Sequence, residues 1–230
     1  MSQRILATLI LGLSVLLNAA CLDREPPFRS PVYVALGASD AVGVGARDPE
    51  TEGWVPRLHS SMPPETRLVN LGVSGSQLSE ALDQQLPVAL AVEPDIVTVW
   101  LAVNDLKNGV PLSTYERDLD RLLRELAATD ATALVGNVPD LASLPVSDEQ
   151  IRTYGTPGRT ALRAEITRWN AAIARVAERH GAVIVNIHAE WRELQKHPEY
   201  ISADGFHPST EGYARLAQLW QTALTSASCR

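Results

Sequence analysis

The chain has 230 residues and a formal net charge of −7 at pH 7, with 20 Lys and Arg against 27 Asp and Glu. This balance lacks the basic footprint of a nucleic-acid-binding protein, so we predict no nucleic-acid partner. The two cysteines, Cys21 and Cys229, stand far apart in the sequence and do not make a disulfide framework. The length fits one domain with a full core.

The first 20 residues have the pattern of a secretory signal peptide. One basic residue, Arg4, precedes an almost purely apolar run from Ile5 to Leu17, and small residues follow that run. The run is short for a membrane span, which needs roughly 20 residues. We therefore predict a signal peptide over residues 1–20, an exported protein, and a polar, proline-bearing tether over residues 21–31.

Cys21 directly follows Ala19 and Ala20, an arrangement that resembles a bacterial lipoprotein signal. The resemblance implies a lipidated Cys21 and a membrane tether. Asn18, however, stands where such signals usually carry a large aliphatic residue. Two alternatives stay open: a membrane-anchored lipoprotein, or a protein released by ordinary cleavage as a secreted or periplasmic chain.

Apolar strand patterns alternate with helical patterns over residues 32–230. The predicted strands span residues 31–37, 66–72, 95–103, 132–138 and 182–187. The predicted helices span 54–61, 77–86, 115–126, 162–176 and 213–220. Ser113 and Glu116 have the spacing of a capping box in front of the third helix. The alternation predicts one α/β domain with a five-stranded parallel sheet covered by helices on both faces.

Chemically useful residues follow several of the predicted strands. Ser39 follows the first strand, Gly72 ends the second, and Asn104 follows the third. The stretch Asp204-Gly205-Phe206-His207-Pro208 stands just before the last helix. Because ligands bind beyond the carboxyl ends of the strands in such sheets, we expect these residues to surround one crevice.

These residue types together fit the chemistry of acyl transfer. Ser39 offers a hydroxyl nucleophile, and His207 offers a base of the type whose unperturbed pKa is about 6.5. Asp204 offers the carboxylate that holds an imidazole in the required tautomer. The N–H groups of Ser39 and Gly72 and the Asn104 amide offer donors for an oxyanion. Each signal alone is weak, since a serine after a strand is more often a helix cap, but the joint order of the signals favours a catalytic site.

The residues Ser39, Gly72, Asn104 and His207, in this order, resemble the four blocks of the SGNH/GDSL esterase–lipase family. The resemblance extends from Val32 to about residue 219. It implies a flavodoxin-like three-layer α/β/α fold and a serine hydrolase with catalytic Ser39, Asp204 and His207 that needs no metal or other cofactor. Two departures stand out: Ala38 and Asp40 flank the serine where the family often has Asp and Leu, and Ala102 replaces a glycine.

The substrate stays open at this level. We expect short or medium acyl esters or lysophospholipids, with carbohydrate O-deacetylation and acyl transfer as alternatives of the same chemistry. The long polar stretch over residues 140–157 is predicted to be a loop that covers the crevice. An inactive surface lipoprotein that binds a ligand in the crevice is the alternative from another functional class. Asp40 has no firm explanation from the sequence.

Overall fold

The computed structural model describes residues 29–194 and 196–227. The predicted signal peptide, Cys21 and Cys229 lie outside these residues. Five parallel strands form one sheet in the order β2-β1-β3-β4-β5. They are β1 (Val32–Gly37), β2 (Arg67–Asn70), β3 (Ile96–Trp100), β4 (Thr132–Gly136) and β5 (Val183–Val185). The predicted α/β fold with a five-stranded parallel sheet is confirmed.

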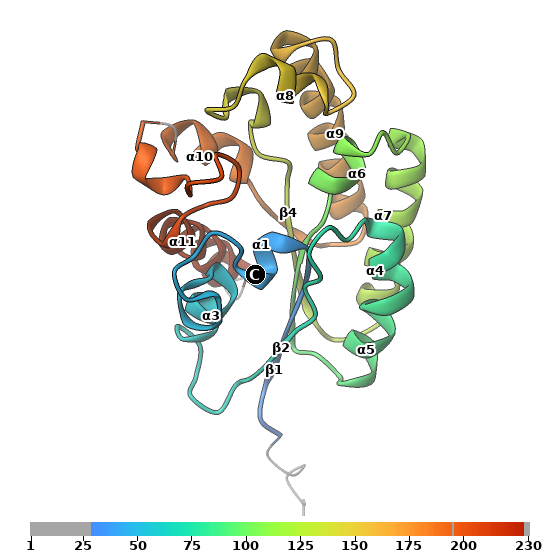
Figure 1. Ribbon diagram of the computed structural model, residues 1–230. Helices are drawn as coiled ribbons and strands as arrows, with labels where there is room; N and C mark the ends of the chain where they lie inside the picture. The colour runs from blue at the N-terminus through green and yellow to red at the C-terminus, as the bar shows by residue number, and fades with distance from the viewer. Residues whose placement is uncertain (1–28, 195, 228–230) are drawn as a thin grey trace, which may run out of the picture.

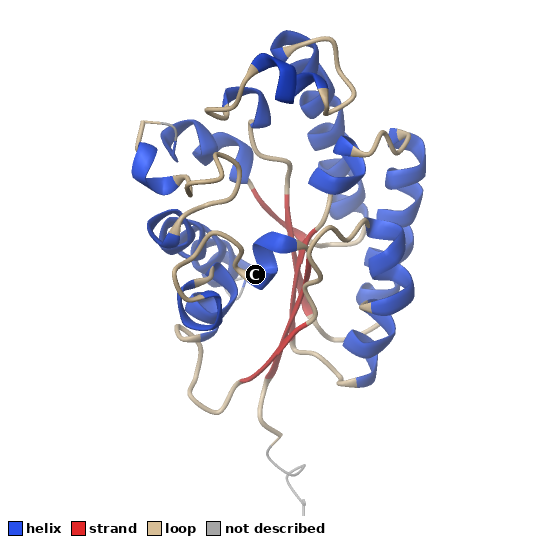
Figure 2. Ribbon diagram, viewed as in Figure 1, coloured by secondary structure: helices blue, strands red, loops and turns tan. Residues whose placement is uncertain are grey.

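Helices cover both faces of the sheet, which is seen nearly edge-on in Figure 2. One face carries α2 (Pro49–Glu52), α3 (Trp54–His59), α10 (Ile187–Leu194) and α11 (Thr210–Ala227). The other face carries α4 (Leu78–Gln84), α5 (Leu86–Ala91), α7 (Leu112–Ala127) and α9 (Arg159–Arg179) (Figure 1). Within the described residues, no helix is long and apolar enough to cross a membrane.

The short helices lie at the carboxyl ends of the strands, where the loops are longest. They are α1 (Ser39–Val42), α6 (Val103–Lys107), η1 (Leu141–Ser143), α8 (Asp148–Arg152) and η2 (Pro198–Tyr200). β3 ends at Trp100, earlier than the prediction of 95–103, because the chain turns at residues 101–102 and starts α6. Asn104 therefore stands on a helix, which holds its side chain in a defined direction.

The burial of each strand follows from its place in the sheet. Every residue of β1 is buried, and β3 is buried over its last four residues, because helices cover both faces of these inner strands. The edge strand β2 begins and ends with the exposed residues Arg67 and Asn70. The other edge strand, β5, has only three residues instead of the six predicted. Apolar runs thus mark the inner strands clearly and the edges poorly.

Aromatic side chains fill both layers between sheet and helices. Trp54 and Trp220 stack at 4.6 Å between ring centroids, and Trp100 packs edge-on against both. On the other face, Tyr115 and Trp169 pack at 4.6 Å. Trp100 and Trp169 are 4% and 2% exposed, so both belong to the core.

Two details of the helix predictions are wrong. Helix α7 begins at Leu112, directly after Pro111, so Ser113 lies inside its first turn and forms no capping bond. Proline fixes its own φ and disfavours helix in the residue before it, which sets this boundary. The capping box instead belongs to α4, where Gln77 and Glu80 bond reciprocally. The predicted helix 77–86 also divides into α4 and α5.

Candidate active site

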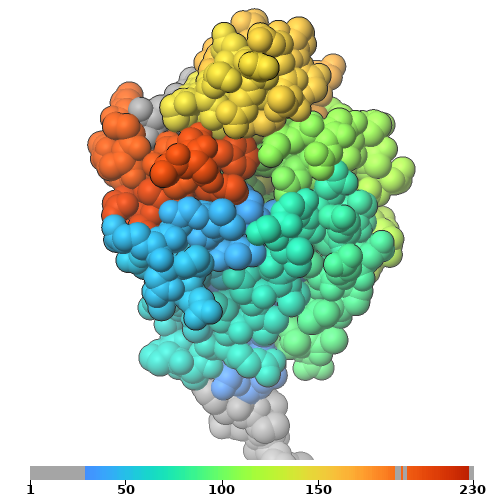
Figure 3. Space-filling view, viewed as in Figure 1, coloured from blue at the N-terminus to red at the C-terminus, as the bar shows by residue number. Residues whose placement is uncertain are grey.

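Ser39, His207 and Asp204 form a continuous hydrogen-bonded chain. Ser39 is the first residue of α1, directly beyond the carboxyl end of β1. Its Oγ lies 2.9 Å from Nε2 of His207, and Nδ1 of His207 lies 2.6 Å from Oδ2 of Asp204. The predicted site residues Ser39 and His207, 168 positions apart in sequence, are thus brought together. In Figure 3 their segments, coloured blue and orange-red, adjoin on the same face of the molecule.

The charge of Asp204 fixes which ring nitrogen of His207 carries the proton. Burial alone would raise the pKa of Asp204, but hydrogen bonds from His207 and its neighbours outweigh burial and hold that pKa well below its usual range. An ionised carboxylate only accepts hydrogen bonds, so Nδ1 of His207 donates to it. Nε2 is then the unprotonated nitrogen, and it accepts the hydroxyl proton of Ser39.

A closed loop sets the position of Asp204. Ile201 and Pro208 form an antiparallel bridge at the base of this loop. Within it, Oδ1 of Asp204 accepts hydrogen bonds from the N–H groups of Phe206 and His207 at 2.8 and 2.9 Å. Because the same carboxylate holds the loop backbone and the imidazole, the two catalytic candidates are positioned together.

The loop after α1 packs against the segment that contains His207 and Pro208. Gly45 has a positive φ of 99°, and a Cβ built on it would stand 2.4 Å from the carbonyl oxygen of Pro208. Only glycine accepts both the conformation and the close approach. Tyr213 donates from its hydroxyl to the carbonyl of Val44 at 2.7 Å, which ties this loop to α11.

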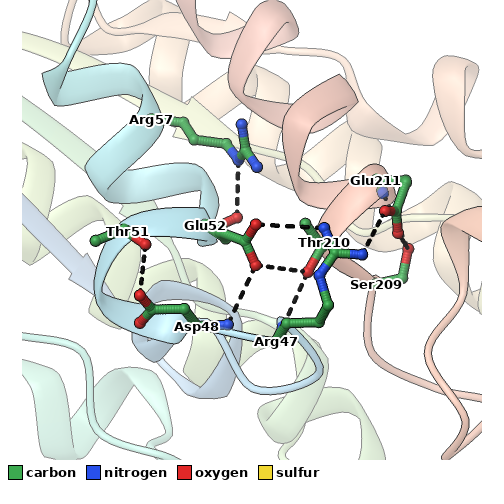
Figure 4. Close-up of polar contacts among 9 residues, drawn as sticks. Arg47, Asp48, Thr51, Glu52, Arg57, Ser209, Thr210 and Glu211 are labelled. Carbon is green, nitrogen blue, oxygen red and sulfur yellow. Dashed lines mark hydrogen bonds and ion pairs between the residues drawn. The ribbon is translucent and has the colours of Figure 1, made fainter.

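Charged and polar residues also join the loop after α1 to the start of α11 (Figure 4). The backbone N–H of Arg47 donates to Oγ1 of Thr210 at 2.9 Å, and the Arg47 guanidinium bridges Glu211 at 2.9 Å and Glu52 at 3.3 Å. Thr210 in turn donates to Glu52 at 3.2 Å. These contacts join the segment that follows Ser39 to the segment that follows His207.

Two of the three predicted oxyanion donors reach the cavity beside Ser39. This cavity has a volume of about 10 Å³ and is lined by Ser39 and Asn104, with Ser76 beside them. Asn104 donates one amide hydrogen to the carbonyl of Ser76 at 3.0 Å, which orients the amide and leaves its second hydrogen available. As a first-turn residue of α1, Ser39 has a backbone N–H that needs no partner within the helix.

Gly72 has a different environment from the one predicted. Its N–H donates to Oδ1 of Asn70 at 3.1 Å, and Gly72 is not among the residues that line the cavity. Gly75, three residues later, is exposed with a φ of 85°, and its N–H has no acceptor among the described residues. Gly75 directly precedes the cavity residue Ser76, so it is the glycine of this loop with a free donor near the site. The first glycine after the predicted strand 66–72 was the sequence signal that could have identified it.

Asp105 anchors the loop that carries Ser76. This carboxylate is 2% exposed and accepts the N–H of Leu78 at the start of α4, at 3.1 and 3.2 Å. Burial raises the pKa of Asp105 to about 6, and the bond from Leu78 only partly offsets that effect. Asp105 therefore connects α6, which carries Asn104, to α4.

We expect the raised pKa of Asp105 to give a measurable pH dependence of stability. An unfolded aspartate has a pKa of about 3.9, so between pH 4 and 6 the folded state holds a proton that the unfolded state has lost. This residue's contribution to the free energy of unfolding therefore falls as pH rises through that window. Relative to wild type, Asp105→Asn should gain roughly 2–3 kcal/mol between pH 4 and pH 7. Urea unfolding of both proteins at several pH values measures this, and parallel curves would contradict it.

The stretch 140–157 lies beside the cavity but is not the plain loop predicted. It contains η1 and α8, and Ile151, which lies in α8, is fully buried. Arg159 holds it in place by donating to the carbonyls of Ala142 and Leu144 at 2.6 and 3.1 Å. Buried apolar residues inside a polar sequence explain the ordered structure. Its position next to the crevice agrees with the expectation (Figure 1).

Comparison with known proteins places the chain in a family. A GDSL-like esterase from Mycobacterium tuberculosis is 28% identical over 214 residues, which are 89% of this chain and 64% of that protein. The chain thus spans less than two thirds of the length of that relative.

Solved structures share the fold at low sequence identity. TesA superposes with a TM-score of 0.67 at 21% identity, over 85% of this chain and 99% of that chain. Axe2, an acetylxylan esterase from Geobacillus stearothermophilus, has a TM-score of 0.67 at 20% identity, over 84% and 93% of the two chains. The model of the GDSL-like Lipase/Acylhydrolase family matches residues 35–215, so the chain belongs to this family.

Proposed function

We propose that the protein is a serine esterase that hydrolyses carboxylic esters through an acyl-enzyme on Ser39. The observation that carries the proposal is the chain from Asp204 through His207 to Ser39, with contacts of 2.6 and 2.9 Å. A hydroxyl becomes nucleophilic when a positioned base takes its proton, and this geometry supplies that base in the required tautomer. Membership of the acylhydrolase family supports the same reaction class.

The proposed reaction has two halves. Oγ of Ser39 attacks the ester carbonyl while Nε2 of His207 takes the hydroxyl proton, and Asp204 stabilises the imidazolium. The tetrahedral intermediate then expels the alcohol, which takes the proton from His207 and leaves the acyl group on Ser39. A water molecule deprotonated by His207 attacks this acyl-enzyme, and collapse releases the acid and restores the serine.

Donors near Ser39 would stabilise the oxyanion of each tetrahedral intermediate. We assign this role to the backbone N–H of Ser39 and the free amide hydrogen of Asn104. For the third donor we favour the N–H of Gly75 over that of Gly72, whose N–H already has an acceptor in Asn70. Donors held in place before the reaction stabilise developing charge without reorganisation, which usually makes this a large contribution to catalysis.

Replacing Asn104 tests the oxyanion assignment. Asn104→Ala should lower kcat on p-nitrophenyl esters by about 10²–10³-fold, because one donor is lost in the transition state. Its melting temperature should stay close to wild type, since the side chain makes one hydrogen bond, to Ser76. Asn108→Ala, at the exposed end of the same helix, is the matched control and should keep its activity. Full activity in Asn104→Ala would exclude the assignment.

Short acyl esters are the favoured substrates. The cavity beside Ser39 has a volume of about 10 Å³, which is room for a group about the size of one water molecule, so a small acyl group fits it best. Medium acyl esters and lysophospholipids would need room outside this cavity. Carbohydrate O-deacetylation uses the same chemistry, and a structurally similar protein, Axe2, is an acetylxylan esterase. Acyl transfer to another acceptor would differ only in what attacks the acyl-enzyme.

Covalent labelling distinguishes an esterase from an inactive binding protein. A fluorophosphonate probe should modify Ser39, detected as a mass increase on the peptide that contains this residue. A panel of p-nitrophenyl esters of increasing chain length should show the fastest hydrolysis with the shortest acyl groups. If the folded protein takes no label and hydrolyses no ester, the binding protein is favoured.

We also propose that the chain is exported and that residues 32–230 form its catalytic domain. The support is the signal-peptide pattern of residues 1–20 and the small residues before Cys21. The mass of the mature N-terminus and partitioning into detergent test the two forms. A lipidated Cys21 would give a detergent-soluble protein with a diacylglyceryl mass, whereas ordinary cleavage would give an unmodified aqueous one.

A further inference from the structure

A second cavity adjoins the one beside Ser39, and Asp40 lies in the wall of both. This second cavity has a volume of about 10 Å³, which is room for a group the size of a water molecule or a hydroxyl. Its remaining walls are apolar or aromatic: Trp100, Val103, Pro139, Leu141 and Phe206. Asp40 is thus a carboxylate next to the proposed nucleophile, and of the residues that the structure describes it is the one polar residue in the lining of the second cavity.

The Asp40 carboxylate is short of donors. Among the described residues, only its own backbone N–H donates to it. Burial raises the pKa of Asp40, and the nearby His207 and Lys107 oppose that effect. Asp40 is half-buried. A carboxylate that loses its remaining solvent costs free energy unless hydrogen bonds satisfy its oxygens, so this group is suited to accept them from a bound molecule.

Lys107, of opposite charge, lies against the ring of Phe206, which lines the same cavity as Asp40. Its Nζ lies 4.6 Å from the ring centroid of Phe206 and 5.5 Å from that of Tyr154. The side chain is half-buried and makes no ion pair within the part of the chain that the structure describes. Its ammonium already occupies the aromatic faces, which disfavours a cationic ligand there. Lys107, which is near enough to Asp40 to lower its pKa, thus offers hydrogen-bond donors beside the Phe206 ring.

These surroundings discriminate between kinds of ester. An alkyl chain placed here would desolvate the Asp40 carboxylate without giving it a hydrogen bond, which is unfavourable. A hydroxyl group can donate to Asp40 and accept from Lys107, while the carbon skeleton that carries it packs on Phe206. Building on the function proposed above, we infer that Asp40 and Lys107 form a subsite for the hydroxyl groups of a polyol or sugar ester, and that they select such esters over alkyl esters.

Matched substrate pairs test this selectivity. Glycerol monoacetate and propyl acetate share an acyl group and a three-carbon alcohol but differ in two hydroxyls. A mono-O-acetyl methyl xyloside and cyclohexyl acetate make the corresponding pair for a sugar ring. In each pair the ratio of kcat/KM for the hydroxylated ester over the alkyl ester is measured. Any general effect of Asp40 on His207 cancels in this ratio, because both substrates pass through the same chemical step.

The wild-type ratio should exceed about 10 in at least one pair. The pair with the larger ratio shows whether the preferred hydroxyl groups belong to a polyol ester or to a sugar ester. Asp40→Leu should lower that ratio at least tenfold, and Lys107→Met should lower it in the same direction. Asp83→Leu, an exposed change on α4, is the control and should leave the ratio unchanged. Asp40→Asn keeps the shape of the side chain and should lower the ratio at least threefold. If Asp40→Leu does not fold, the result with Asp40→Asn tests the subsite.

The outcomes separate the subsite from the proposed function. If wild type hydrolyses the acetates, Ser39→Ala does not, and the ratio is near 1 or unmoved by the Asp40 variants, the subsite is overturned while the esterase stands. If hydrolysis persists unchanged in Ser39→Ala, or wild type hydrolyses no ester, the proposed esterase fails and the subsite fails with it.

Discussion

Ser39→Ala is expected to abolish ester hydrolysis, with a loss in kcat on the order of 10⁶-fold. Without Oγ no acyl-enzyme forms, and what remains is the activation of water by the binding site and the oxyanion donors alone. The fold should be unaffected, because the Ser39 side chain makes one hydrogen bond, to His207, at the edge of the cavity. Initial rates on p-nitrophenyl acetate measure the loss, and the thermal unfolding curve reports the fold.

A matched serine variant separates this effect from nonspecific damage. Ser60 ends α3, is exposed and donates from Oγ to the carbonyl of Pro56 at 2.9 Å. Ser60→Ala should keep wild-type kcat. Hydrolysis by Ser39→Ala at more than about one-hundredth of the wild-type rate would remove Ser39 as the nucleophile, given the size of the loss expected for that role.

Asp204→Asn should lower kcat by about 10⁴-fold with little change in structure. The asparagine Oδ1 can still accept the backbone hydrogen bonds from Phe206 and His207, so the loop persists. Its Nδ2 is a donor, however, and facing His207 it would require Nδ1 to be the unprotonated nitrogen. Nε2 would then carry the proton and could no longer take one from Ser39.

The measurements on Asp204→Asn must distinguish a change in the tautomer of His207 from a change in the structure. A loss in kcat with KM and melting temperature near wild type supports the tautomer explanation. Asp83→Asn, on the exposed face of α4, is the matched change and should leave kcat unchanged. A crystal structure of Asp204→Asn with the His207 ring displaced from Ser39 would contradict the tautomer explanation, because a change in position and not in protonation would then account for the loss.

Periodicity predicted the sheet because burial on both faces leaves a direct trace in the sequence. VYVALG in β1 and IVTVW in β3 are apolar since helices cover both sides of the inner strands. Helix boundaries were less accurate. Ser113 and Glu116 fit a capping pattern, but the neighbouring Pro111 set the start of α7. Local patterns compete at helix ends, and the sequence alone does not rank them.

The order of the strand-end residues predicted which side chains would meet. Strands in a parallel sheet point the same way, so their carboxyl ends share one edge, and Ser39 and Asn104 met there as expected. His207 reaches the same edge from the loop before α11. Proximity of these groups could thus be inferred from connectivity. Their catalytic roles remain predictions that the variants above test.

What the sequence determined by itself was the fold class and the meeting of Ser39, Asn104 and His207 at one edge of the sheet, because both depend on apolar periodicity and chain order. Only the tertiary structure decided which groups are free to act. The Gly72 N–H is occupied because Asn70 turns its amide oxygen toward it, and no sequence pattern records that choice. Asp40 and Lys107 likewise acquired meaning only when folding placed Asp40 in one cavity wall with Phe206 and Lys107 against the Phe206 ring. Hydrogen-bond satisfaction depends on the three-dimensional neighbours of each group, which distant segments supply.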